Sequence, residues 1–125
     1  MVAGGANNRA GNNDGFATNA THAIVGGGNG NTAGNVYATV GGGASNAATG
    51  FAATVAGGQS NSATGYAAIV AGGGASAANA DYATVAGGYN SIAGGIGSFV
   101  GGVARDGLRS SGVDGSLQLV PSRIR

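Results

Sequence analysis

The sequence predicts an all-β fold, a flattened β-solenoid of about six fifteen-residue coils, and three features of its repeat predict it. Valine recurs every fifteen residues, at Val25, Val40, Val55, Val70, Val85 and Val100. A glycine stands two residues after each valine. An alanine stands eight residues after each of the first five valines, and Leu108 stands eight residues after Val100. A small residue stands two residues before each valine, namely Ala23, Ala38, Ala53, Ala68, Ala83 and Ser98. A strict period of this length is typical of repeat proteins, in which each unit buries its apolar side against the next.

The composition agrees with a thin repetitive structure and not with an ordinary globular core. Glycine contributes 29 of the 125 residues, whereas Leu, Ile, Val and Phe together contribute only 22. Lysine and glutamate are absent and glycine is spread along the whole repeat, so we expect essentially no helix. The net charge is only +1 and the valines keep their period, which argues against a disordered chain.

The first strand of each repeat is expected just before and at the valine. In residues 37–41, alternation places Ala38 and Val40 on one face and Tyr37 and Thr39 on the other. The face with the valine is the apolar one and should point inward. The predicted core column is therefore Val25, Val40, Val55, Val70, Val85 and Val100, with Ala38, Ala53, Ala68 and Ala83 beside it.

Glycine corners and a second strand complete the repeat. Gly42 and Gly43 allow a tight bend at positive φ. A second short strand over residues 46–49 then brings Ala48 opposite the valine of the first strand. Gly50 turns the chain back, and the pattern restarts. Two short strands and two corners per fifteen residues describe one coil of a β-roll.

The N-terminal segment, residues 1–20, is expected to form a partial first coil with an inserted loop. Residues 2–11 match the repeat, but Val2 precedes Val25 by twenty-three residues. About eight residues are therefore inserted around 12–21, and we expect them on the surface. The first residues have neither the basic start nor the apolar run of a signal peptide, so an export signal would belong to a longer parent protein, or export would use another route.

The repeat β-roll is expected over residues 21–103, and residues 104–125 are expected to form a C-terminal cap or docking tail. The pattern decays after Val103, where charged residues become frequent. Residues 116–120 alternate like a last strand before Pro121. Atypical end segments are the usual way in which a solenoid closes its open edge.

The outward-facing positions form columns that predict self-association. Each coil buries only one valine and two alanines, so we expect a second chain to cover part of the outside, most simply in a closed symmetric oligomer. The candidate oligomer face is the column just before the valines, made of Ile24, Thr39, Thr54, Ile69, Thr84 and Phe99. The next outward column is His22, Tyr37, Ala52, Ala67, Tyr82 and Gly97. The alternative interpretation is that Thr and Tyr merely suit an exposed strand.

The stretch Tyr37-Ala38-Thr39-Val40-Gly41-Gly42, followed by Ser45-Asn46-Ala47-Ala48-Thr49-Gly50, resembles the head repeat of the YadA-type trimeric autotransporter adhesins. The usual repeat of that family reads Asn-Ser-Val-Ala-Ile-Gly, then a spacer and Ala-x-Gly. The resemblance extends over about residues 2–103. It implies a left-handed parallel β-roll packed as a homotrimer, with the inward residues of the family falling on Ala38 and Val40, Ala53 and Val55, Ala68 and Val70, and Ala83 and Val85.

Residues that could carry chemistry are few and scattered. His22 is the single histidine and has no acidic residue near it in the sequence, which favours a surface or interface position over catalysis. The four aspartates share no repeat position, since they stand at Asp14, Asp81, Asp106 and Asp114. Cysteine is absent, which excludes disulfides and thiolate metal sites. The sequence therefore predicts no enzyme, no cofactor and no metal site.

Two further polar sets have structural interpretations. Without interleaved aromatic residues, the C-terminal arginines favour a solvated cap over a nucleic-acid site; they are Arg105, Arg109, Arg123 and Arg125. Four asparagines hold one repeat position and either cap turns or form a hydrogen-bonded ladder along the stack, of which we favour the ladder; they are Asn8, Asn31, Asn46 and Asn61.

The sequence indicates a non-enzymatic structural and adhesive module that forms a stiff segment of an extracellular fibre, on a cell surface or a virion. Its partners would be further copies of itself, in a trimer, and a host or surface receptor, with no nucleic acid and no membrane insertion. One alternative is a segment of a phage or injection-system tail fibre. A second is a filament subunit that stacks end to end. Ice binding by stacked threonines is disfavoured because Ile24, Ile69 and Phe99 interrupt the array.

Overall fold

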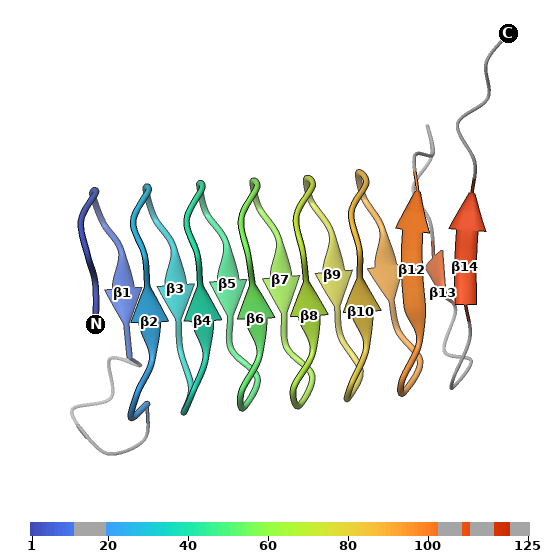
Figure 1. The fold of residues 1–125 in the computed structure, drawn as a ribbon, viewed down its shortest axis with the longest axis horizontal. Helices are drawn as coiled ribbons and strands as arrows, with labels where there is room; N and C mark the ends of the chain where they lie inside the picture. Colours follow the sequence, from blue (N-terminus) through green and yellow to red (C-terminus); the bar gives the residue numbers. More distant parts are fainter. Residues whose placement is uncertain (12–19, 103–108, 111–116, 121–125) are drawn as a thin grey trace, which may run out of the picture.

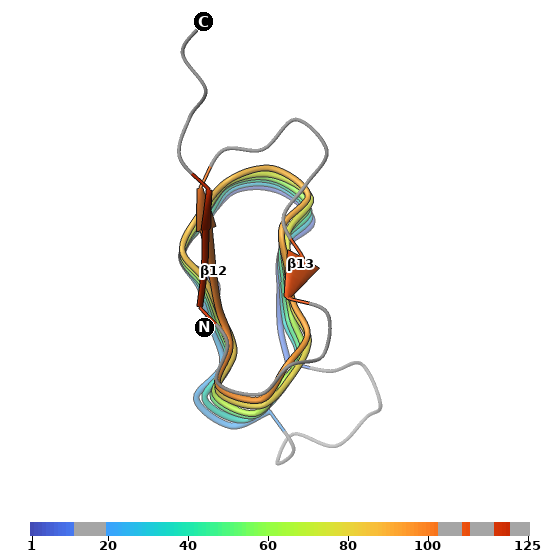
Figure 2. The same cartoon turned by 90° about the vertical axis from the view of Figure 1, so that its right-hand side faces the viewer.

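The computed structural model confirms the all-β solenoid. It describes residues 1–11, 20–102, 109–110 and 117–120, and these contain parallel strands and no helix. Successive coils stack side by side along one axis, from β1 near the N-terminus to β14 near the C-terminus (Figure 1). Seen along that axis, each coil is a flattened loop with one strand on each long side (Figure 2). The described chain is therefore a two-sided rod.

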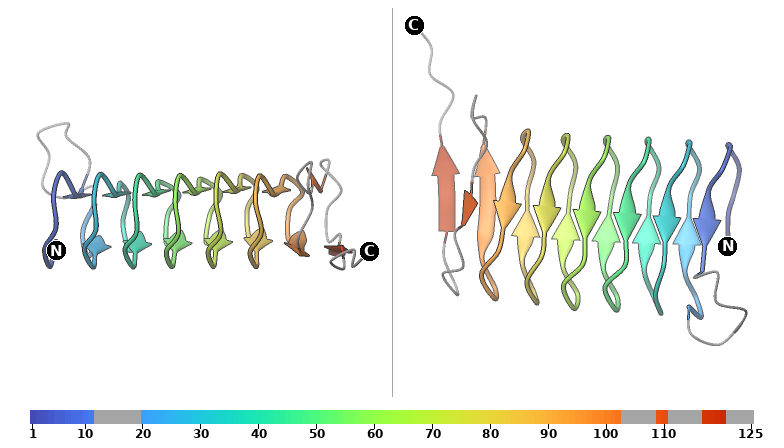
Figure 3. Two further views of the ribbon diagram at one scale, coloured as in Figure 1. Left: turned by 90° about the horizontal axis from the view of Figure 1, so that it is seen from above. Right: turned by 180° about the vertical axis from the view of Figure 1, so that it is seen from behind.

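The two long sides are two parallel sheets of seven strands each. One sheet consists of β2 (Ile24–Val25), β4 (Thr39–Val40), β6 (Thr54–Val55), β8 (Ile69–Val70), β10 (Thr84–Val85), β12 (Phe99–Gly102) and β14 (Leu117–Val120). The other consists of β1 (Arg9–Ala10), β3 (Thr32–Ala33), β5 (Ala47–Ala48), β7 (Ser62–Ala63), β9 (Ala77–Ala78), β11 (Ile92–Ala93) and β13 (Arg109–Ser110). Views from above and from behind show the coils in a straight row (Figure 3).

The register follows the fifteen-residue period between β2 and β12. Val40 pairs with Val55 in the parallel sheet, and Val85 pairs with Val100. At the N-terminal end Ala10 pairs with Ala33, which is the twenty-three-residue offset expected from the insertion. Residues 12–19, where the inserted loop was expected, lie outside the described residues.

At the C-terminal end the register differs from the prediction. Ser110, and not Leu108, pairs with Ala93, and Gln118 pairs with Val100. The assignment of Leu108 to the sixth alanine position was therefore wrong. The offsets are seventeen and eighteen residues instead of fifteen, because the last coil holds extra residues that fall in segments outside the described chain. Counting along the sequence in steps of fifteen residues cannot reveal residues that are added within one coil.

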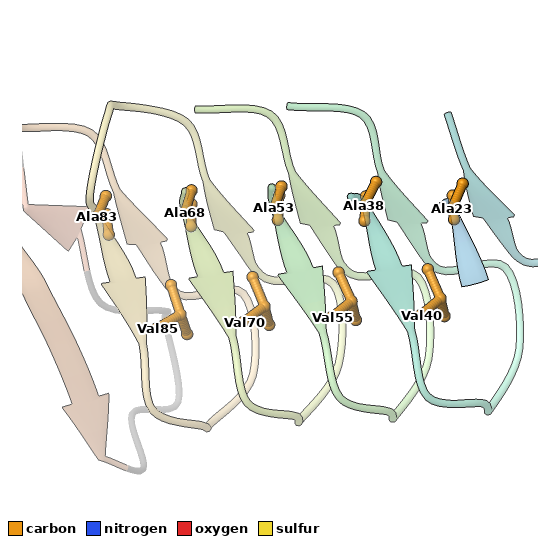
Figure 4. Close-up of a cluster of buried hydrophobic side chains, with 14 of the residues drawn as sticks. Ala23, Ala38, Val40, Ala53, Val55, Ala68, Val70, Ala83 and Val85 are labelled. Atoms are coloured by element: carbon orange, nitrogen blue, oxygen red, sulfur yellow. The ribbon is translucent and has the colours of Figure 1, made fainter. Parts of the chain in front are cut away.

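The core is a column of small side chains between the two sheets. The six valines of the predicted column are 0% exposed, and so are Ala38, Ala53, Ala68 and Ala83. The valines and these alanines form two parallel rows along the inside of one sheet (Figure 4). The other sheet contributes alanines that are also fully buried, namely Ala33, Ala48, Ala63, Ala78 and Ala93. The same small side chains recur in each coil, which gives the rod a narrow and constant cross-section.

The strands are shorter than the alternation predicted, because left-handed corners interrupt them. Tyr37 has a φ of 58° and Ser45 a φ of 56°, so both occupy corners. Of the two predicted bend residues, Gly43 has a positive φ, at 90°. The second outward column was therefore wrongly placed on a strand: all its members have positive φ and lie at corners, namely His22, Tyr37, Ala52, Ala67, Tyr82 and Gly97.

Candidate functional site

The candidate oligomer face forms one continuous column on the outer side of its sheet, which we call the outer column. Its members are successive register partners in that sheet: Ile24, Thr39, Thr54, Ile69, Thr84 and Phe99. Ile24 is 39% exposed and Ile69 is 41% exposed, whereas the threonines and Phe99 are partly exposed. The outer column therefore presents methyl groups, hydroxyls and one aromatic ring on a flat surface.

A second column is polar and lies inside the rod. Asn31, Asn46 and Asn61 are buried at the same position of successive coils. The Asn46 backbone N–H donates to Oδ1 of Asn31 at 3.0 Å, and the Asn61 N–H donates to Oδ1 of Asn46 at 3.0 Å. Nδ2 of Asn46 donates to the carbonyl oxygens of Gly42, at 2.9 Å, and Gly58, at 2.8 Å. The favoured hydrogen-bonded ladder is thus confirmed, although its links run mainly from side chain to backbone; between Asn8 and Asn31 a side-chain link is present as well, from Nδ2 of Asn31 to Oδ1 of Asn8 at 3.2 Å.

Serines continue this polar column toward the C-terminal end. The Ser76 N–H donates to Oδ1 of Asn61 at 3.0 Å, and the Ser91 N–H donates to Oγ of Ser76 at 3.1 Å. The Ser91 hydroxyl is buried and has no hydrogen-bond partner among the described residues, and the same holds for Ser98, which belongs not to this column but to the row of Ala38, Ala53, Ala68 and Ala83. A serine makes fewer of these links than an asparagine, so the column holds neighbouring coils together more strongly in its N-terminal part.

A third column is aromatic and lies on the corner that precedes the outer column. We call it the ring ladder; its members are His22, Tyr37, Phe51, Tyr66 and Tyr82. The ring centroids of neighbouring coils are 5.2, 5.7, 5.1 and 5.5 Å apart in that order. The two shorter contacts are between nearly parallel rings, with interplanar angles of 14° and 7°. The other two are edge contacts, at 85° and 66°.

The alternation of ring geometry follows from the sequence spacing. His22 and Tyr37 are fifteen residues apart, and so are Phe51 and Tyr66, so each of these pairs occupies one repeat position and its rings are parallel. Tyr37 and Phe51 are fourteen apart, which moves the ring to the preceding position and turns its plane. Tyr66 and Tyr82 are sixteen residues apart, so the ring returns to the repeat position of Tyr37.

The sequence analysis missed the ring ladder because it followed single repeat positions. At the position of Tyr37 the next coil carries Ala52, and the aromatic side chain of that coil is Phe51, one residue earlier. The signal that could have found the ladder is one aromatic residue per coil within a window of two adjacent positions. Tyr89 belongs to a different corner, where its isolated bridge partner in the preceding coil is Gly74.

The remaining chemical groups form no reactive cluster in the described part of the chain. The ring of His22 is stacked on Tyr37, and Oδ1 of Asp81 accepts a hydrogen bond from the Tyr66 N–H at 2.9 Å. Within residues 1–11, 20–102, 109–110 and 117–120, no group of three His, Cys, Asp or Glu side chains is placed to hold a metal ion. The other candidates lie outside the described residues, namely Asp14, Asp106, Asp114, Arg105, Arg123 and Arg125.

Comparisons with known proteins add no family to this picture. Nothing matched the chain among protein-family models, curated proteins or solved structures. Among the described residues, no helix has the length and apolar character needed to cross a membrane. The three columns are therefore the features from which a function can be argued.

Proposed function

We propose that this chain is a non-enzymatic structural and adhesive module, a left-handed β-roll that associates as a homotrimer and forms a stiff segment of an extracellular fibre. The observation that carries the proposal is the outer column. It places exposed isoleucine and partly exposed threonine and phenylalanine side chains in one straight line above the buried valines and alanines of the core. A second copy packed against the outer column would bury these side chains, of which isoleucine and phenylalanine are larger than the side chains inside the coil.

The straight stack supports the fibre role. The coils are joined by parallel backbone pairing in both sheets and by the buried asparagine column, so bending the rod would break several hydrogen bonds per coil. The extracellular location and the trimer come from the resemblance to adhesin head repeats. A tail-fibre segment would use the same rod, since both roles need length and stiffness and no reactive site.

The test compares two arginine substitutions on opposite sheets. Ile69→Arg puts a charge in the outer column, whereas Ser62→Arg puts the same charge on β7 of the other sheet. We expect the parent chain and Ser62→Arg to sediment at three times the 11.5 kDa chain mass. Ile69→Arg should associate about tenfold more weakly or run as a monomer, because an unpaired charge in a contact is costly to desolvate.

The oligomer mass of the unsubstituted parent chain tests the proposal even if a substituted chain folds poorly. A parent that stays monomeric at every concentration would contradict the assembly. Equal weakening by Ile69→Arg and Ser62→Arg would contradict the choice of face. A mass that keeps growing with concentration would favour end-to-end filaments over a closed trimer.

A further inference from the structure

At the corner of the ring ladder, one aromatic or imidazole ring is present in each of five successive coils, although the ring occupies two different repeat positions. Val36 precedes Tyr37, whereas Ala52 follows Phe51, so a coil carries its ring at one position or the other. Each ring nevertheless contacts the ring of the next coil at 5.1 to 5.7 Å. The continuous feature is therefore the aromatic edge of the rod and not a residue position.

Stacking between neighbouring rings leaves part of each ring surface exposed. Flat aromatic carbons touch at about 3.5 Å, so parallel rings whose centroids are 5.1 or 5.2 Å apart are offset and leave part of each face uncovered. The exposed fractions agree: 52% for Tyr37, 36% for Phe51, 45% for Tyr66 and 60% for Tyr82. The edge therefore offers ring surface to a partner at nearly every coil.

The surroundings of the ring ladder are polar and almost uncharged. Thr49, Thr64 and Asn79 are exposed and stand two or three residues before the rings of their coils. Oγ1 of Thr64 donates to Oδ1 of Asn79 at 3.3 Å, so hydroxyl and amide groups continue along the edge. Asp81 is the one carboxylate in the described part of the chain, and its Oδ1 already accepts a hydrogen bond from the backbone N–H of Tyr66. This chemistry does not favour a polyanion or an ionic peptide.

We propose that the ring ladder binds an extended, neutral polysaccharide of β-1,4-linked pyranose units laid along the rod. Such a chain presents apolar C–H faces to aromatic rings and hydroxyls to threonine and asparagine side chains. The ladder repeats with the coil rise of about 4.8 Å, which is close to the advance of one sugar in an extended chain of this linkage. Several weak contacts on a rigid edge then add up without any deep pocket.

This proposal deepens the adhesive part of the proposed function and rests on it, but the ring ladder is complete within one chain. It needs no residue from a second copy. Binding of polysaccharide and formation of a trimer can therefore be measured separately.

The test uses cellohexaose and the hexamer of N-acetylglucosamine as probes, with titration calorimetry and the intrinsic tyrosine fluorescence of a chain that has no tryptophan. The double variant Phe51→Ala/Tyr66→Ala removes the central parallel pair. Tyr89→Ala is the matched control, because Tyr89 is 63% exposed and lies outside the ladder. We expect at least one probe to bind the parent and Tyr89→Ala alike, and to bind the double variant about tenfold more weakly or not at all.

A second variant separates loss of binding from loss of folding. Phe51→Leu/Tyr66→Leu keeps apolar volume at the corner and removes only the rings, and thermal melting shows whether each variant is folded. Failure of both probes to bind the parent would overturn the proposal, and so would unchanged binding by a folded leucine variant. If the ring variants alter the oligomer mass while the parent binds neither probe, the ladder is a contact between copies. A monomeric parent that still binds a probe would overturn the trimer and leave the polysaccharide site standing.

Discussion

At the scale of single residues, the buried asparagines hold neighbouring coils together by hydrogen bonds, in a rod whose apolar core is small. Each side chain accepts one backbone N–H from the next coil and donates to two glycine carbonyls. The Asn61 N–H is buried and has the Asn46 side chain as its acceptor, whereas the Gly58 carbonyl also accepts the Ala44 N–H at 3.0 Å. An unsatisfied buried polar group costs about 1–3 kcal/mol, so the asparagine fixes both the corner shape and the distance between coils.

Substitution of Asn46 tests this role. Asn46→Ala should lower the free energy of unfolding by about 1–3 kcal/mol, because it leaves the buried Asn61 N–H without its acceptor and removes the bond to the Gly42 carbonyl, while the Gly58 carbonyl keeps its bond from the Ala44 N–H. Asn46→Ser should lower it less, since Ser76 shows that a hydroxyl at this position still accepts the N–H of the following coil. Urea denaturation measures both values. Equal losses for Ala and Ser would contradict a hydrogen-bonding role.

At the scale of the coil, glycine is required where one corner stacks directly on the next. An added Cβ on Gly58 would lie 2.2 Å from the carbonyl oxygen of Gly73, and the φ of Gly58 is +92°. The same close approach recurs at Gly28 and Gly43. Neighbouring Gly57 differs, because nothing lies within 4 Å of the position that its Cβ would occupy. Of these two adjacent glycines, only Gly58 is required by its backbone conformation and by the space around it.

The comparison of these two glycines is the second test. Gly58→Ala should destabilise the rod by about 1–3 kcal/mol from backbone strain alone, and by more where the backbone contact cannot relax. Gly57→Ala should leave the melting temperature unchanged or raise it slightly, because alanine reduces the freedom of the unfolded chain. Thermal melts of both variants measure this difference in stability. A Gly58→Ala chain as stable as the parent would show that the corners do not stack as closely as described.

Comparison of the predicted and observed coil shows what periodicity can and cannot reveal. The valine period predicted the strands, the parallel register of Val40 on Val55 and the buried alanines, because burial demands the same small side chain at each repeat. It overestimated strand length at Tyr37, since a left-handed corner with a tyrosine has no signature in residue type. It also missed the ring ladder, whose members share an edge in space but not a position in the repeat.

At the scale of the whole molecule, the proposed functions depend on the straight and regular stack. The outer column, the buried asparagine column and the ring ladder are linear only because each coil repeats the position of the one before (Figure 3). A fibre segment, a contact between copies and a site for a polymer all use such linear arrays. None of the three needs a cleft or a reactive group.

The most direct measurement of this stack is disulfide trapping, since the chain contains no cysteine of its own. Thr54 and Ile69 are register partners on β6 and β8, and neighbouring strands are about 4.8 Å apart, within the Cα separation of about 4.4–6.8 Å that a disulfide spans. In the control, Thr54→Cys is combined with Ser62→Cys, which lies on β7 of the opposite sheet. Both chains are oxidised at low concentration, and free thiols are counted by mass spectrometry.

The solenoid predicts that Thr54→Cys/Ile69→Cys closes a disulfide within one chain and that Thr54→Cys/Ser62→Cys keeps both thiols free. The opposite result, an open pair at 54 and 69 with a closed pair at 54 and 62, would contradict the fifteen-residue register on which the three columns depend.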